Sequence, residues 1–417
     1  MQQGLRVMGV KSVVERQQFD IAIVGAGIAG ASLAVALRGE GLSIALIEAQ
    51  PIDRSRLSMD RSLDDFDPRV SALTPRSRAL LEQLGVWQSI ADYRHCPYHH
   101  MTVWDAQGTG EIDFDRADVN LSELGHIVEN RAITSALLAK VDASPDISRL
   151  QPAALLTCTR LSSSRVLLEL EHGEMLETNL LVAADGALSR VRTMMAFESR
   201  EWDYGHRAIV ATVEVARPHR NTALQRFLPT GPLALLPLPS ANGRHYCSMV
   251  WSLQEHLVDD LLALGDEPFC AELERAIEGR VGTVICSTKR FAFPLRQRHA
   301  IDYVQPGVAL VADAAHTIHP LAGQGINLGL QDVAVLAEEI LSGHACGVSP
   351  GQLELLRRYQ RRRKGENLMM MTAMDSFKRL FEQQSLPLRW LRNTGMRFVG
   401  QMRPLKQQLM RHAMGLG

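Results

Sequence analysis

The sequence predicts a mixed α/β fold, in which a domain built on a parallel sheet is interleaved with a β-rich domain and closed by a helical C-terminal region. Near the N-terminus an apolar strand, a glycine-rich turn, a helix and a second strand follow one another within about 30 residues. Strand-like segments separated by Pro and Gly occupy residues 204–253, and helical patterns fill residues 332–341, 353–381 and 387 onward.

The first element is a strand from Phe19 to Val24, followed at once by GAGIAG, a helix over residues 31–37 and a strand over 43–47 that ends on Glu48. This is the Rossmann-like dinucleotide-binding pattern. Gly25 makes the tight turn, Gly27 lets a pyrophosphate approach the backbone, and Gly30 lets the helix pack on the sheet. Glu48 can accept both hydroxyls of an adenosine ribose, and its charge disfavours a 2′-phosphate. The pattern predicts FAD or NAD rather than NADP.

The middle of the chain carries a second candidate site. Residues 54–67 are too polar to pack and are interpreted as a surface loop. Helices are expected over 75–84 and 133–141, an alternating strand region over 101–114, and a hairpin from residue 165 that leads into a buried strand ending at Asp185-Gly186. Ser189, Arg190 and Arg192 follow. This segment suits either a ligand-binding turn or an ordinary turn with a surface salt bridge.

A third candidate site follows an apolar strand expected from Val308 to Ala312. Asp313 comes directly after it, then a loop with Pro320, Gly323 and Gly325, and a helical pattern from about Asn327. A carboxylate past a strand, followed by glycines and a helix start, builds a polar crevice beside a sheet. Asp313 can accept a hydroxyl from a sugar-like chain, and N–H groups at the helix start can face an anionic or electron-rich ring edge.

Composition limits the function classes. The chain has 417 residues and a formal charge of −1, which argues against nucleic acid as a partner. The charge is uneven, because residues 357–417 hold fourteen Lys and Arg against three acids. The six cysteines show no CxxC or zinc-ligand spacing, so reduced thiols and no metal site are expected. No apolar run is long enough to span a bilayer, and the first 18 residues lack the core of a signal peptide. We therefore expect a cytoplasmic protein.

Together GAGIAG, ADGALSRVR (184–192) and VADAAHTIHPLAGQGINLG (311–329) resemble the FAD-dependent aromatic hydroxylases of the para-hydroxybenzoate hydroxylase type. The closer resemblance is to the branch that hydroxylates polyprenylated phenols in ubiquinone biosynthesis. It covers nearly the whole chain and includes LGVW (84–87), LGHIVEN (124–130) and VWSL (250–253).

The resemblance implies a role for each matching residue. Gly25, Gly27, Gly30 and Glu48 would hold the ADP half of FAD, and Arg69 and Asn130 would lie near the flavin and its ribityl chain. Asp185 and Gly186 would serve both FAD and reduced nicotinamide. Asp313 would bind the ribityl chain. The flavin edge would be lined by Pro320, Gly323, Gln324, Gly325, Ile326 and Asn327. Ala312 departs from the family, which usually has glycine there, and its methyl group is expected to crowd the ribityl chain slightly.

The implied function is monooxygenation of a polyprenylated phenol with O2 and NAD(P)H through a flavin C4a-hydroperoxide. The flavin does the chemistry, so no metal or nucleophile is needed, and the nicotinamide cofactor would bind transiently. Two alternatives stay open. One is the same chemistry on a small soluble aromatic compound, and the other is a non-catalytic flavin-binding scaffold subunit of a biosynthetic complex. The ring carbon, the prenyl length, the choice of NADH or NADPH and the oligomeric state are not determined by these motifs.

Two further features have two interpretations each. His316 and His319 flank the flavin loop and are either acid–base groups or residues that hold its geometry; the second is favoured, because an activated phenol needs little help with proton transfer. The basic C-terminal region, with Trp390 and Phe398, is either a cover on the fold or a contact with the inner face of the membrane. A ubiquinone-biosynthesis protein complex is a further candidate partner.

The predicted division is discontinuous. An FAD-binding domain spans 18–98, 122–196 and 297–345, a substrate domain spans 99–121 and 197–296, and a helical C-terminal region spans 346–417.

Overall fold

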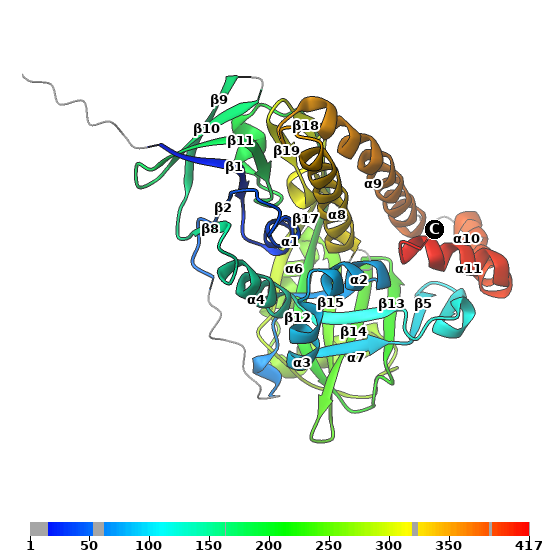
Figure 1. Ribbon diagram of the computed structural model, residues 1–417. Coiled ribbons are helices and arrows are strands. Elements are labelled where there is room, and N and C mark those ends of the chain that lie inside the picture. Colours follow the sequence, from blue (N-terminus) through cyan, green and yellow to red (C-terminus); the bar gives the residue numbers. More distant parts are fainter. Residues whose placement is uncertain (1–15, 53–61, 163, 319–323, 383–385, 417) are drawn as a thin grey trace, which may run out of the picture.

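The computed structural model describes residues 16–52, 62–162, 164–318, 324–382 and 386–416. It confirms the mixed α/β class, with three sheets in the described part of the chain and long helices at the C-terminal end (Figure 1).

The first sheet is mainly parallel, with the order β18-β19-β11-β1-β2-β8. Its centre joins distant segments, because β1 (Arg16–Val24) lies parallel between β2 (Ile44–Ile47) and β11 (Met175–Ala183), and β19 (Val308–Leu310) pairs parallel with β11. Antiparallel strands extend the β11 side. The remaining strands are β8 (Ile147–Leu150), β9 (Leu155–Ser162), β10 (Arg165–Leu170) and β18 (Val304–Gln305). The carboxyl ends of β1, β11 and β19 therefore meet at one edge, where ligands bind in such sheets.

Helices cover this sheet and form the larger core with it. α1 (Ile28–Ala36) contacts both α4 (Asn130–Asp142) and α8 (Gln324–Ala345). The second half of β1 and the whole of β2 and β19 are apolar and buried, as is usual for the strands of a parallel sheet. The smaller helices of this part are α2 (Pro75–Gln83), α3 (Trp87–Tyr93) and α5 (Arg190–Met194).

The second sheet has nine strands and its own core. Its order is β20-β17-β12-β15-β14-β13-β5-β6, with β16 paired to β12. The bounds are β5 (His100–Asp105), β6 (Glu111–Asp115), β12 (Ser199–Val215), β13 (Thr222–Leu228), β14 (Gly231–Ala241), β15 (Arg244–Gln254), β16 (Val284–Ser287), β17 (Phe291–Ala300) and β20 (His316–Thr317). Helices α6 (Glu255–Ala263) and α7 (Asp266–Ala276) belong to this part. β20 brings the segment after Asp313 onto the edge of this sheet.

A small antiparallel sheet, β3-β7-β4, completes the strands. It consists of β3 (Val70–Leu73), β7 (Gly125–Glu129) and β4 (His95–Tyr98). Short 3₁₀ turns occur at Leu63–Asp65, Arg116–Val119 and Ala312–Ala314.

The C-terminal helices pack on both larger sheets. α9 (Leu353–Glu382) lies beside α8, and its Tyr359 hydroxyl donates to the carbonyl of Leu310 at 2.8 Å. α10 (Leu386–Gln401) and α11 (Arg403–Ala413) pack against the region of β5 and β6 (Figure 1). Within the described residues, no helix combines the length and hydropathy that crossing a bilayer requires.

Two expectations about local structure need correction. The strand expected over 308–312 ends at Leu310, and Asp313 lies inside a 3₁₀ turn. The loop before Arg69 does pack at its end, since Phe66 is buried against Tyr246. The sequence reading also omitted β13, α6 and α7. The discontinuous domain boundaries remain a prediction.

Candidate functional site

The glycine turn after β1 has a different steric requirement at each glycine. Gly25 has φ +104°, and a Cβ there would lie 2.4 Å from the carbonyl oxygen of Ala184. A Cβ on Gly30 would lie 1.9 Å from the carbonyl oxygen of Gly25, so both positions exclude a side chain. A Cβ on Gly27 would meet nothing within 4 Å, and no side chain caps α1 there. The start of α1 is therefore open to a ligand phosphate.

Glu48 lies beside this turn. Its Oε2 accepts the N–H of Ala26 at 2.9 Å and its Oε1 accepts the N–H of Gln50 at 3.0 Å. The two bonds fix a half-buried carboxylate at the end of β2, next to the first glycine turn. Each oxygen keeps a second lone pair for a ligand hydroxyl.

Asp185 and Gly186 are brought directly against the first turn, because β11 pairs with β1 so that Ala183 lies opposite Val24. The Asp185 Oδ2 accepts the N–H groups of Arg190 at 2.8 Å and Val191 at 3.3 Å, which caps α5. Its Oδ1 is buried and has no hydrogen-bond partner within the described residues. A bound donor would satisfy this orphaned acceptor, which is an observation that fits a hydroxyl-bearing nucleotide.

Asp313 lies in the 3₁₀ turn that connects β19 of the first sheet to β20 of the second. Its side chain is exposed to solvent, yet the surrounding protein is dense enough that burial raises the pKa of its carboxyl. Asp332 adds to this rise in pKa and His316 opposes it. An exposed carboxylate at this junction can accept hydroxyls from a bound ligand.

The start of α8 is only partly described. Gln324 begins the helix, Gly325 and Ile326 follow half-buried, and His319, Pro320 and Gly323 lie outside the described residues. The Asn327 side chain is buried, where its Oδ1 accepts the N–H of Thr74 at 3.0 Å and its Nδ2 donates to Ala72 at 2.9 Å. Asn327 thus ties α8 to the β3–α2 connection.

Arg69 and Asn130 meet at one end of the small sheet, directly before β3 and directly after β7. The N–H of Asn130 donates to the carbonyl of Arg69 at 3.0 Å, and its Oδ1 accepts the hydroxyl of Ser71 at 2.6 Å. The Arg69 guanidinium lies over the ring of Phe293, 5.4 Å from its centroid, and so reaches β17 of the second sheet. The exposed Arg69 therefore lies where the two sheets approach each other.

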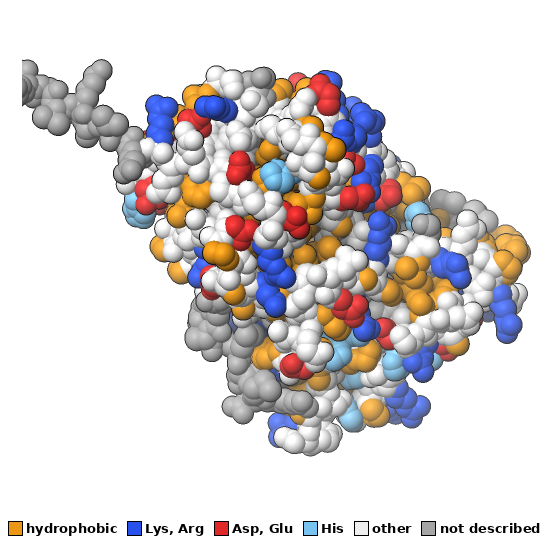
Figure 2. All heavy atoms as spheres, in the orientation of Figure 1, with side chains coloured by type: hydrophobic (Ala, Val, Ile, Leu, Met, Phe, Trp, Pro, Cys, Tyr) orange, Lys and Arg blue, Asp and Glu red, His pale blue; other side chains and the backbone are white. Residues whose placement is uncertain are grey.

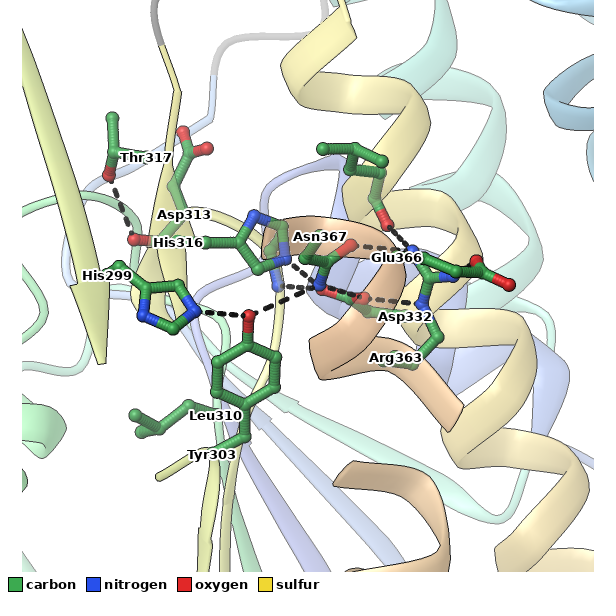
Figure 3. Close-up of polar contacts among 12 residues, drawn as sticks. His299, Tyr303, Leu310, Asp313, His316, Thr317, Asp332, Arg363, Glu366 and Asn367 are labelled. Carbon is green, nitrogen blue, oxygen red and sulfur yellow. Dashed lines mark hydrogen bonds and ion pairs between the residues drawn. The ribbon is translucent and has the colours of Figure 1, made fainter. Parts of the chain in front are cut away.

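His316 has a structural partner. It is buried, and its Nε2 lies 2.5 Å from Oδ2 of Asp332 on α8 (Figure 3). Because the carboxylate can only accept, this nitrogen carries the proton. Burial by itself raises the pKa of Asp332, but His316 and Arg363, through charge and hydrogen bonds, outweigh it and lower the pKa to about 2.

Sequence reasoning missed Asp332 and Arg363, and it named Arg192 without assigning that residue a role of its own. Arg192 is buried and donates to the carbonyls of Ala314 at 2.9 Å and Ala187 at 2.8 Å, so it links the second candidate site to the third. This is neither a surface salt bridge nor a free cation for a ligand. One signal in the sequence could have identified Asp332 as a buried charge. It lies on the apolar face of a predicted helix, with Leu328 at i−4 and Leu336 at i+4.

The fold and this site define a nucleotide-binding protein of the FAD type. Two glycine-containing turns and an acidic strand end lie together at one edge of the parallel sheet, and a third acid and a helix start lie where the same edge continues. The chain accordingly matches the model described as FAD binding domain over residues 18–372, and it belongs to that family.

Relatives match the chain over nearly its whole length. It is 36% identical over 401 residues to 3-demethoxyubiquinol 3-hydroxylase of Escherichia coli, covering 96% of this chain and 99% of that one. It is 37% identical to ubiquinone hydroxylase UbiL of Rhodospirillum rubrum, over 95% of this chain and 89% of the relative. It is 32% identical to the mitochondrial ubiquinone biosynthesis monooxygenase COQ6 of Homo sapiens, over 95% and 92%.

Solved structures share the fold at low identity. PqsL from Pseudomonas aeruginosa superposes with a TM-score of 0.75 at 20% identity, covering 92% of this chain and 100% of that one. A variant of HpxO from Klebsiella pneumoniae, complexed with FAD, gives 0.72 at 18% identity, covering 96% and 99%.

Proposed function

We propose that this protein is an FAD-dependent monooxygenase that hydroxylates the aromatic ring of a polyprenylated phenol in ubiquinone biosynthesis, using O2 and NAD(P)H. The observation that carries the proposal is the end-to-end match to ubiquinone hydroxylases, 36% identity over 96% of this chain and 99% of the relative. Two features of the structure also support FAD independently of the relatives. The start of α1 is open to a phosphate, and Oδ1 of Asp185 lacks a hydrogen-bond donor.

FAD supplies electron transfer and oxygen activation when bound. In our proposal the chain's own residues bind and orient it. Gly25, Gly27 and Gly30 admit its pyrophosphate, and Glu48 accepts the hydroxyls of its adenosine ribose. Asp313 accepts hydroxyls of the ribityl chain.

At the ring end of the site we assign two roles. The backbone of α8 from Gln324 to Asn327 lines the ring edge, where N–H groups at a helix start favour negative charge. Arg69 lies between the sheets, on the approach to the ring. No proton transfer by a side chain is required of this arrangement.

The test is turnover by purified protein with FAD, reduced nicotinamide, isotopically heavy O2 and a prenylated phenol in detergent or vesicles. We expect one heavy oxygen atom in the product by mass spectrometry, and none with Asp313→Ala. Hydroxylation of small soluble phenols alone would favour a catabolic enzyme. Nicotinamide oxidation absent under every condition would favour a scaffold subunit.

We further propose that α10 contacts the membrane in which such a substrate resides. Trp390 is 71% exposed and Phe398 is 57% exposed on this helix, with Arg397 and Arg403 exposed nearby. Figure 2 shows hydrophobic and basic side chains next to one another over the part of the surface that α10 and α11 form. Exposed aromatic residues beside cations suit an anionic bilayer surface.

Co-sedimentation with anionic vesicles tests this contact. The double change Trp390→Ser with Phe398→Ser should reduce the binding that persists at high salt, and Arg397→Gln with Arg403→Gln should reduce the salt-sensitive part by about 1 kcal/mol per charge. Trp202→Ser is the control, an exposed tryptophan outside the C-terminal helices. Vesicle binding unchanged in both double variants would contradict the contact and direct attention to a protein complex instead.

A further inference from the structure

The backbone of the turn that carries Asp313 is strained at Ala312. Ala312 has φ +53°, a left-handed conformation that costs free energy for any residue with a Cβ and persists only where the surroundings impose it. The N–H of Ala312 donates to Oδ2 of Asp332 at 3.1 Å. His316, at the other end of the turn, donates to the same oxygen. One carboxylate from α8 therefore holds both flanks of Asp313.

The second oxygen of Asp332 joins this turn to the C-terminal region (Figure 3). Oδ1 accepts Nε of Arg363 at 2.8 Å and Nδ2 of Asn367 at 3.1 Å, both from α9. Arg363 also donates to the Asn367 side chain at 2.9 Å and contacts Glu366. All acceptor directions of Asp332 are thus used, as a charge without solvent exposure requires.

Tyr303 and His299 are further polar residues beside Asp332, Arg363 and Asn367. The hydroxyl of Tyr303 lies 3.0 Å from Nε2 of His299 and 3.4 Å from Nδ2 of Asn367. Arg363 is the guanidinium that contacts Asp332 within the described residues, and it is itself buried. The charge of Asp332 is therefore balanced from α9, a helix that is remote in sequence from the three nucleotide-binding turns.

We propose that Asp332 is a positioning residue for the FAD site, which fixes the Ala312–His316 turn so that Asp313 meets the ligand, and that Arg363 supplies the positive charge that keeps Asp332 in this role. The inference rests on the proposed function only through FAD binding. It makes α9 a part of the cofactor site rather than a cover over it.

The experiment compares two buried ion pairs. Asp332→Asn replaces one acceptor oxygen with a donor that faces Arg363 or the turn. Asp105→Asn is the matched control, because Asp105 and Arg392 form an equally buried pair 2.6 Å apart that joins β5 to α10. FAD affinity is measured by quenching of flavin fluorescence at a temperature well below both unfolding transitions, and stability by thermal unfolding of the apoproteins.

Both variants should unfold at lower temperature than the wild type. Only Asp332→Asn should lose FAD affinity, by about 10–100-fold, which is the loss that follows removal of a group that orients a metal-binding residue. Equal weakening of FAD binding in both variants, or undiminished binding in Asp332→Asn, would overturn the inference. A wild-type protein that bound no FAD would overturn the proposed function as well.

A second variant separates positioning from stability, and serves if Asp332→Asn does not fold. Asp332→Leu combined with Arg363→Met replaces the pair with apolar side chains, which often restores stability. The unfolding temperature should return toward that of the wild type while FAD affinity stays low, because Ala312 and His316 have lost their acceptor. Recovery of FAD affinity together with stability would mean that the pair serves the fold alone.

Discussion

Ala312 and Gly329 face each other where the turn before Asp313 meets α8. A Cβ on Gly329 would lie 2.7 Å from the Cβ of Ala312. The methyl group at 312 is therefore packed against α8, and its expected slight crowding of the ribityl chain stays a prediction. The pair is complementary, since the absence of a side chain at 329 makes room for the one at 312.

Substitutions at these two positions should not be additive. Gly329→Ala should lower the free energy of unfolding by about 1–3 kcal/mol through overpacking. Ala312→Gly should be close to neutral or stabilising, because relief of the left-handed conformation is offset by about 0.4–1 kcal/mol of unfolded-state entropy. In the double variant the clash is gone and the better helix propensity of Ala remains. Chemical denaturation of the four proteins measures the coupling; simple additivity would show that the two residues do not touch.

FAD affinity should depend on pH through Asp313. In the free protein burial raises the pKa of the Asp313 carboxyl above the ordinary 3.8, whereas ligand hydroxyls bind the ionised form. Affinity should therefore fall as pH decreases through this raised pKa, by up to about tenfold per pH unit. Titration of FAD binding between about pH 7 and 4 checks this. Asp313→Asn should be flat across that range, and an equal pH dependence in this variant would assign the effect to another group.

The residues predicted to bind FAD are those that form a recognisable motif with their neighbours in the sequence. Glycines at fixed spacing and an acid at a strand end carry their signal within a few positions, as Gly25 and Glu48 do. Asp332 and Arg363 lie 31 residues apart in sequence, on two different helices, and become partners only when those helices pack. No local pattern records such a pair, so sequence reasoning had no means of joining them.

At the scale of elements, α10 depends on one buried ion pair. Arg392 is 3% exposed and contacts Asp105, and the amide of Asn393 accepts the N–H of Gly110 at 2.5 Å. Arg392 is therefore a cation of the basic C-terminal region that faces the fold and not the outer surface. The helix carries its exposed aromatic residues on one side and its anchoring residues on the other.

Arg392→Gln and Arg397→Gln should therefore differ, although both remove one positive charge. Loss of Arg392 leaves Asp105 buried without its cation and should cost about 3–5 kcal/mol of stability. Loss of the exposed Arg397 should change stability by less than about 0.5 kcal/mol. Thermal unfolding distinguishes them, and equal unfolding temperatures would contradict the anchoring role of Arg392.

Elements were predicted well where periodicity is strong and poorly where it is not. The pattern at residues 353–381 matches α9, and the alternation from residue 101 matches β5 and β6. β13 was missed because only its pairing with β5 and β14 marks it as a strand. The strand expected through Ala312 ends early because the turn that presents Asp313 overrides an apolar run.

At the scale of the whole molecule, the parallel sheet draws its adjacent strands β1, β11 and β19 from segments that leave the ribosome far apart in time. β1 is complete by residue 24, but its neighbour β11 ends at residue 183 and β19 at residue 310. The hydrogen bonds of Asp332, which holds the Asp313 turn, are complete only when Asn367 is present. A nascent chain consequently passes most of its synthesis without a finished cofactor site. Stalled chains of increasing length should therefore begin to quench flavin fluorescence only after α9 has emerged, which would make loading of FAD one of the last events in the maturation of this protein.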